Sequence, residues 1–125
     1  MIIIDTSIWI DFLKGNFQYT QIIIELIQKR DVLLLECITS ELLQGAKSKR
    51  EIQIILNYWD HLPNISSDGL WIEAGILSHK EKLLSKGIGL IDSFIISACK
   101  STRSKLWTLD KKIINNLDKN FLFQP

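Results

Sequence analysis

The sequence is poor in several residue types that would indicate particular classes of protein. It has two cysteines, Cys37 and Cys99, and their wide separation provides no paired spacing for a zinc site or a redox motif. We therefore expect both to be buried free thiols in a reducing compartment. The two prolines and six glycines are scattered, so no linker or repeat is indicated, and we predict one domain over residues 1–125.

A strong charge imbalance is absent as well. The chain carries 15 Lys and Arg against 14 Asp and Glu, a formal net charge of +1, which is not the basic balance typical of nucleic-acid-binding domains. The basic residues nevertheless form three local groups, which either line a binding rim or are solvated helix surfaces. These groups are Lys47, Lys49 and Arg50; Lys80, Lys82 and Lys86; and Lys100, Arg103 and Lys105.

Long apolar runs are also missing. The apolar start of the chain reaches Asp5 at once, whereas a signal peptide needs a basic start and a longer apolar stretch. No segment has the ~20 apolar residues needed to cross a bilayer, so we expect a soluble, cytoplasmic protein with no membrane partner. Apolar residues still make up 46% of the chain, which excludes an intrinsically disordered protein.

Short apolar segments alternate with helical patterns along the chain. Residues 2–5, 32–36 and 106–109 have the composition of buried strands, and residues 62–65 are a further candidate. Strands that alternate with helices predict an α/β fold, with a parallel sheet covered on both faces. The expected helices lie around Trp9, over 18–29, from Thr39 or Ser40 to Gly45, over 50–60, from Asp68 to Gly87, from Ile91 to Cys99 and over 111–117.

Four acidic residues occupy positions from which they could face one crevice. In open α/β sheets, functional groups collect at the carboxyl ends of the strands. Asp5 ends the first predicted strand, and Asp110 directly follows the last one. Asp92 opens the helix with the clearest apolar periodicity, and Glu41 lies in the first turns of another helix. The four acids are therefore candidates for a shared site.

A shared site of this kind would need a cation. Carboxylates that lie close together repel one another, which raises their pKa values unless a positive charge separates them. Mg²⁺ and Mn²⁺ favour oxygen ligands, and such an ion can bind a phosphate and lower the pKa of a bound water. The residue types and their placement thus agree with metal-dependent chemistry on a phosphodiester.

Each of these acids also has a simpler structural interpretation. Asp5 could be a polar stop after a strand, and Glu41 could complement a helix dipole. Asp92 could be a helix N-cap, and Asp110 a turn residue. Composition and periodicity alone leave these interpretations open beside the metal site.

Four motifs in order along the chain resemble the PIN-domain pattern. They are Asp5, Thr6 and Ser7 after an apolar strand; Glu41, Leu42 and Leu43 with Gly45; Ile91 and Asp92 leading into an apolar helix; and the run from Leu106 to Asp110. The resemblance covers nearly the whole chain, and the length is similar to that of VapC-type toxins of bacterial and archaeal toxin–antitoxin pairs. It implies a three-layer α/β/α sandwich with a short, mainly parallel central sheet.

The resemblance also implies an activity and a set of site residues. A PIN domain of this type would be an endoribonuclease that cleaves single-stranded RNA with Mg²⁺ or Mn²⁺. The residues that match its catalytic and metal-binding acids are Asp5, Glu41, Asp92 and Asp110, with Thr6, Ser7 and Thr108 as supporting hydroxyl residues. Ser7 could alternatively be a helix N-cap. Lys112 stands where many relatives carry a further acid or Asn, which is a departure from the pattern.

The resemblance further implies protein partners. VapC-type toxins are homodimers that a cognate antitoxin holds inactive. Trp9, Phe12 and Ile22–Ile24 are candidates for a dimer interface, with core packing as the alternative.

Other classes fit the sequence less well. A haloacid-dehalogenase-like phosphatase needs a second Asp where Ser7 stands, and a response-regulator receiver domain needs an Asp after a middle strand, near residue 65. A non-catalytic PIN-fold module that binds RNA or protein is the remaining alternative, although all four acids are present.

Overall fold

The computed structural model describes residues 1–15 and 18–125, and a short parallel sheet lies at its centre. Strand β1 (Ile2–Ile4) pairs in parallel with β2 (Lys105–Trp107). The three isoleucines of β1 are all buried, as expected of β-branched residues on a central strand. Isolated parallel bridges extend the sheet on both sides; they join Ile2 with Val32, Leu34 with Asn64 and Leu106 with Leu122.

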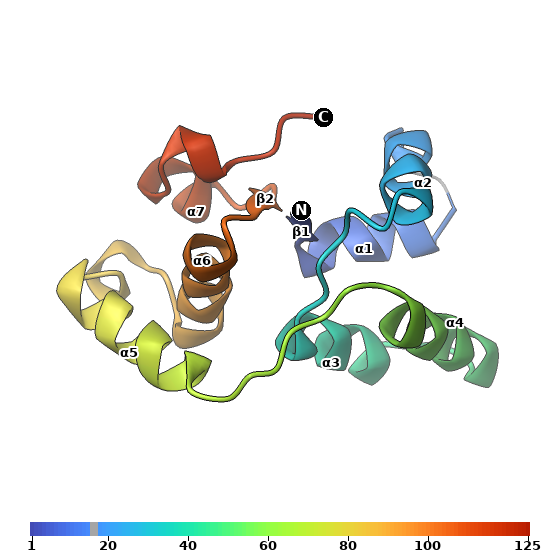
Figure 1. Ribbon diagram of the computed structural model, residues 1–125, viewed down its shortest axis with the longest axis horizontal. Coiled ribbons are helices and arrows are strands. Elements are labelled where there is room, and N and C mark those ends of the chain that lie inside the picture. The colour runs from blue at the N-terminus through green and yellow to red at the C-terminus, as the bar shows by residue number, and fades with distance from the viewer. Residues whose placement is uncertain (16–17) are drawn as a thin grey trace.

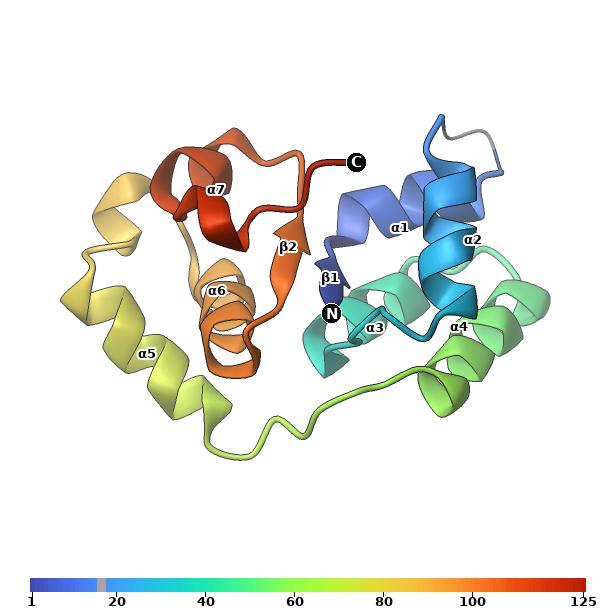
Figure 2. The ribbon, with the colours of Figure 1, turned by 45° about the horizontal axis from the view of Figure 1, so that its top comes forward.

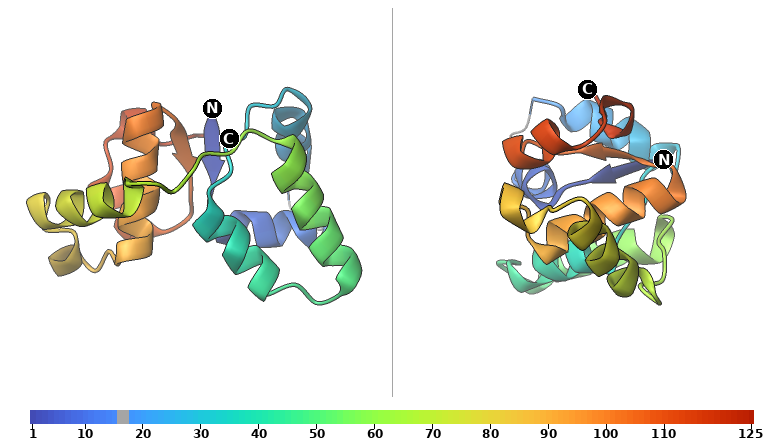
Figure 3. Two further views of the ribbon diagram at one scale, coloured as in Figure 1. Left: turned by 60° about the horizontal axis from the view of Figure 1, so that its bottom comes forward. Right: turned by 90° about the vertical axis from the view of Figure 1, so that its left-hand side faces the viewer.

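Two groups of helices enclose this sheet (Figures 1 and 2). The first group contains α1 (Thr6–Leu13), α2 (Thr20–Gln28), α3 (Glu36–Gln44) and α4 (Lys49–His61), and the second contains α5 (Leu70–Lys80), α6 (Leu90–Thr102) and α7 (Lys111–Asn116). Two short 3₁₀ helices, η1 (Leu84–Lys86) and η2 (Lys119–Phe121), complete the second group. Figure 3 shows β1 between the two groups from another direction. The predicted α/β fold with a short parallel sheet is therefore confirmed.

Helix α6 forms the centre of the core on one side of the sheet. Its residues from Ser93 to Cys99 are all buried, and the Ser93 hydroxyl is satisfied by donating to the Gly89 carbonyl at 2.9 Å. Helix α5 packs against it, and the rings of Trp71 and Phe94 lie 4.2 Å apart between centroids. The amphipathic pattern that predicted α6 reflects this position, because its wide apolar stripe faces the sheet and α5.

Aromatic packing dominates the other side of the sheet. Trp9 of α1 is 2% exposed and contacts the rings of Phe12 and Tyr58. Ile23, at the centre of the apolar run of α2, is fully buried. Core packing is therefore the role of Trp9 and Ile23, and neither is available to a dimer interface in this structure.

Several predicted element boundaries are wrong. Helix α3 begins at Glu36, so neither Thr39 nor Ser40 caps it, and the Thr39 N–H donates within the helix to the Leu35 carbonyl at 3.0 Å. The helix starts directly after the buried residues 32–35, and no side chain caps it. Over 32–36, where a strand was predicted, the chain forms only isolated bridges at Val32 and Leu34.

The predicted helix from Asp68 to Gly87 is also divided. Gly69, with a φ of +76°, precedes α5, which ends at Lys80, and η1 follows before Gly87, with a φ of +79°. Positive φ favours glycine because it has no Cβ. The break itself lies at Lys82, whose φ of +55° interrupts the helical backbone between α5 and η1.

Both cysteines are free, but they differ in burial. Cys99 is buried, whereas Cys37 is only partly so, contrary to expectation. Burial raises the pKa of Cys99 to about 12 and that of Cys37 to about 11, so both thiols are neutral at physiological pH. No helix within residues 1–15 and 18–125 combines the length and the apolar character needed to span a membrane.

Candidate active site

The register of the two strands places Asp5 beside Thr108. The Asp5 N–H donates to the Trp107 carbonyl at 2.9 Å, which continues the β1–β2 ladder past the last residue of β1. The Thr108 hydroxyl donates to Asp5 Oδ2 at 2.7 Å, and the Thr6 N–H donates to Asp5 Oδ1 at 2.8 Å. Asp5 is thus the N-cap of α1, and hydrogen bonds to both of its oxygens fix the orientation of its carboxylate.

Thr108 also connects Asp5 to Asp110. The Asp110 N–H donates to Thr108 Oγ1 at 3.1 Å, so the buried hydroxyl accepts one hydrogen bond and donates the other. Asp110 in turn is the N-cap of α7, and its Oδ1 accepts from the Lys112 N–H at 2.8 Å. Residues at the ends of the two neighbouring strands therefore form one hydrogen-bonded network, although Asp5 and Thr108 are 103 residues apart in sequence.

Asp92 lies in the first turn of α6, and it is not the cap of that helix, which is Gly89. Its pKa is raised from the ordinary value of 3.8, first by burial and then by the negative charges of Asp5, Asp110 and Glu41. Lys112 acts in the opposite direction and lowers it. Because the other three acids all act on Asp92, the fold brings the four sequence-predicted acids into one electrostatic neighbourhood.

Glu41 is the most separate of the four acids. Its exposed side chain lines a cleft of about 250 Å³ between α1, α3 and α4. Lys14, Lys47 and the acidic Glu51 line the same cleft, so charges of both signs lie beside Glu41. Lys47 belongs to a basic group visible in the sequence, whereas nothing local singled out Lys14; its place results from the packing of α1 on α3.

The two hydroxyl residues after Asp5 have different surroundings. Thr6 is half-buried, and it holds Asp5 through its backbone N–H. Ser7 is exposed on the first turn of α1, and its alternative role as an N-cap is wrong because Asp5 occupies that position. Any part that the Thr6 and Ser7 hydroxyl groups have in a reaction stays a prediction.

The donor set suits a hydrated divalent ion better than a closed metal cage. Within the part of the chain that the structure describes, no three His, Cys, Asp or Glu side chains converge closely enough to enclose a metal ion by themselves. Mg²⁺, however, usually keeps several waters and needs only one or two direct carboxylates. The repulsion that raises the pKa of Asp92 is the kind that such a cation relieves. The chemistry of the four carboxylates is therefore compatible with a hydrated Mg²⁺ or Mn²⁺ ion.

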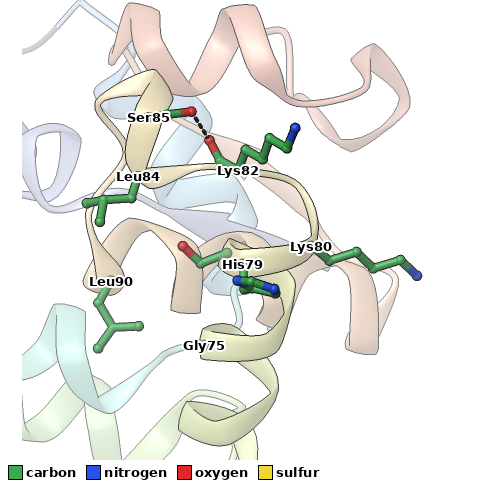
Figure 4. A pocket seen from close by; sticks show the side chains of 8 residues that line it. Gly75, His79, Lys80, Lys82, Leu84, Ser85 and Leu90 are labelled. Carbon is green, nitrogen blue, oxygen red and sulfur yellow. Dashed lines mark hydrogen bonds between the residues drawn. The ribbon is translucent and has the colours of Figure 1, made fainter.

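A larger hollow lies elsewhere, between α5, η1 and the start of α6 (Figure 4). It has a volume of about 1040 Å³, and none of the four acids lines it. Its lining is mixed, with His79, Lys80 and Lys82 beside Leu84 and Leu90. The size of a hollow therefore does not locate the acidic cluster in this protein.

Comparison with known proteins gives the same family as the sequence motifs. The PIN domain matches residues 2–120, so the chain belongs to the PIN-domain family. Among solved structures, the chain is similar to one in the crystal structure of VapBC2 from Rickettsia felis bound to a DNA fragment from their promoter. The two are 22% identical over 99% of this chain and 98% of that chain, with a TM-score of 0.71, which shows a common fold. None of the curated proteins matches this sequence.

Proposed function

We propose that this PIN-domain chain is a metal-dependent endoribonuclease, which cleaves single-stranded regions of RNA and acts in the cytoplasm as the toxin of a type II toxin–antitoxin pair. The observation that carries the proposal is the convergence of four acids on one electrostatic neighbourhood beside the carboxyl ends of β1 and β2. Membership of the PIN family supports a nuclease. The likeness to a chain of VapBC2 supports the toxin assignment by analogy of fold.

In this proposal the four acids would divide the work at the metal. Asp5 and Asp92 would hold Mg²⁺ or Mn²⁺, and Glu41 and Asp110 would complete the site or orient the attacking water. The ion would supply a positive charge that polarises the phosphate and lowers the pKa of a nearby water. Thr108 holds Asp5 in one orientation, so this carboxylate needs little rearrangement when substrate arrives.

The cleft beside Glu41 is a suitable contact for an antitoxin. Its apolar walls include Ile10 and Leu13, and it opens directly at one of the proposed catalytic acids. A segment of a cognate antitoxin bound here would block the approach of RNA. Competition between the antitoxin and a short RNA, measured by fluorescence anisotropy, tests this part of the proposal, and simultaneous binding of both would contradict it.

The chain is also proposed to be a homodimer. Since Trp9 and Ile23 belong to the core, the surface must come from other apolar side chains. The most exposed of these are Ile72 and Ile76 on α5 and Leu84 in η1, with exposed fractions of 71%, 62% and 78%. Light scattering at micromolar concentration should give twice the mass of the chain, and a monomer would refute this expectation.

Cleavage of a mixed pool of single-stranded RNA tests the enzyme assignment. The purified chain is incubated with Mg²⁺, with Mn²⁺ and with EDTA, beside Asp5→Asn and a control, Asp60→Asn, which changes an exposed acid of α4. We expect metal-dependent fragments with the unaltered chain and the control, and none with Asp5→Asn. RNA binding without cleavage by the folded, metal-bound protein would favour a non-catalytic PIN-fold module. Cleavage retained in Asp5→Asn would overturn the site assignment.

A further inference from the structure

Lys112 has a defined position next to the acidic cluster. Its backbone N–H is held by Asp110, and the end of its side chain lies across Gly87. A Cβ on Gly87 would come within 3.3 Å of both Cδ and Nζ of Lys112, and within 3.4 Å of Cε. The lysine therefore does not simply extend into solvent, because three consecutive atoms at its end pack on the glycine.

The positive charge of Lys112 affects the acidic cluster. Its ammonium opposes the three carboxylates that raise the pKa of Asp92. Lys111, its neighbour in the first turn of α7, is exposed as well and provides a matched comparison. Gly87 lies just before Gly89, the cap of α6, and Asp110 is the cap of α7. These two contacts hold the lysine between the starts of the two helices, at the edge of the acidic cluster.

We propose that Lys112 is a fixed cation of this site: it supplies, at the edge of the acidic cluster, positive charge that a second divalent ion would otherwise supply, and it binds a non-bridging phosphate oxygen of the RNA. This inference rests on the proposed function and names a residue for phosphate binding within it. A lysine suits this role because its ammonium is a compact point charge with three donors. One divalent ion and one ammonium would then share the work of stabilising charge on the phosphate.

The proposal has consequences for metal binding that do not depend on catalysis. A cation beside Asp92 repels a divalent ion that binds the same carboxylate, so removing it should strengthen ion binding. It should also leave room for a second ion. Gly87 contributes because it has no side chain, and a methyl group there would crowd the flexible end of the lysine and shift it slightly.

Titration of the whole chain with Mn²⁺, followed by calorimetry and by electron paramagnetic resonance, tests the metal part. We expect one ion per chain in the unaltered protein, and roughly three- to tenfold tighter binding in Lys112→Ala. Lys112→Asp should bind a second ion, and the matched control Lys111→Ala should behave as the unaltered protein. Two ions in the unaltered chain, or equal affinities in Lys112→Ala and Lys111→Ala, would overturn the proposal.

Gly87→Ala provides a second route to the same result. It should tighten Mn²⁺ binding in the same direction as Lys112→Ala, and the double variant should bind no more tightly than Lys112→Ala alone. Circular dichroism monitors the fold, since alanine is strained at this positive φ. Additive effects of the two substitutions would mean that Gly87 does not act through Lys112, and would overturn this coupling.

RNA affinity tests the phosphate contact. In an Asp5→Asn background, which should not cleave, fluorescence anisotropy with a short single-stranded RNA should show binding about tenfold weaker after Lys112→Ala. Lys112→Arg should retain most of the affinity, and Lys111→Ala should change it little. Equal losses of RNA affinity in Lys111→Ala and Lys112→Ala would mean that Lys112 only attracts RNA by its general positive charge. That result would overturn the specific phosphate contact.

The Mn²⁺ titration also separates this inference from the proposed function. A chain that cuts no RNA but shows the Lys112 response would overturn the nuclease assignment and support the lysine as a cation of the metal site. A chain that cuts RNA and shows no Lys112 response would support the nuclease and overturn the inference.

Discussion

The acidic cluster consists of two unlike halves. Asp5 and Asp110 directly follow strands, and their carboxylates accept hydrogen bonds from the backbone or from Thr108. Asp92 and Glu41 lie on helices, and among the described residues no donor bonds to either carboxylate. The strand-end half is therefore oriented before any ligand arrives, whereas the helix half has free oxygens that can turn toward a cation.

The two halves also affect stability in opposite ways. Asp5 and Asp110 are N-caps, so their hydrogen bonds stabilise α1 and α7. The raised pKa of Asp92 means that its ionised form is disfavoured in the folded protein without metal. One half of the site thus supports the fold, and the other half gains its favourable partner only when a cation binds.

Removing one negative charge from either half should slow cleavage by a similar factor. For both Asp5→Asn and Asp92→Asn we expect the cleavage rate to fall by about a thousandfold or more, equivalent to about 4 kcal/mol of transition-state stabilisation. Single-turnover rates on one oligonucleotide measure this, with Asp60→Asn as the control. Near-normal activity of Asp92→Asn would show that this residue of the helix half is not needed for cleavage.

Loss of the hydrogen bond between the strand ends should have a smaller effect. Thr108→Val keeps the shape of the side chain but removes the donor to Asp5, and we expect Mn²⁺ affinity and cleavage to fall by about 10- to 100-fold. Thr102→Val is the matched control, because it removes a hydroxyl that bonds to Ala98 and Ser104 outside the site. If both variants lose activity equally, the effect of Thr108 is structural only.

The change in the free energy of unfolding should have opposite signs for substitutions in the two halves. Asp5→Asn replaces one of two acceptor oxygens, which receive Thr6 and Thr108, by an amide donor, and it should lower the free energy of unfolding by about 1 kcal/mol. Asp92→Asn removes a repelled charge and should raise it by about a few tenths of a kcal/mol, because this side chain is partly exposed. Urea unfolding without metal measures both values, and changes of equal sign would contradict the division.

The pH dependence of stability should reflect Asp92 in the same direction. Its folded pKa lies above the ordinary value of 3.8, so its stabilising contribution is complete below that pH and is lost as the pH rises through the raised pKa. As the pH rises from 3.8 through the raised pKa, the free energy of unfolding of the metal-free protein should therefore fall relative to that of Asp92→Asn, and it should stay lower at higher pH. Saturating Mg²⁺ at neutral pH should reverse the order, because it binds only the folded, ionised form.

The site residues could be chosen from the sequence because their positions follow from local patterns. Asp5 follows three buried isoleucines, and Asp110 follows an apolar segment of the same kind, so both were expected at strand ends. Asp92 was found through the periodicity of α6. The predicted start of α3 was wrong by about one turn, because it relied on a capping side chain and this helix begins without one.

The sequence by itself predicted the fold class and singled out the four acids as candidates, since these depend on short patterns of apolar and polar residues, and the family resemblance added Thr108. Only the tertiary structure decided that Thr108 bonds to Asp5, that Lys14 lies near Glu41 and that Lys112 packs on Gly87. These contacts join segments far apart in the chain. They depend on strand register and on how helices pack, which no local pattern specifies.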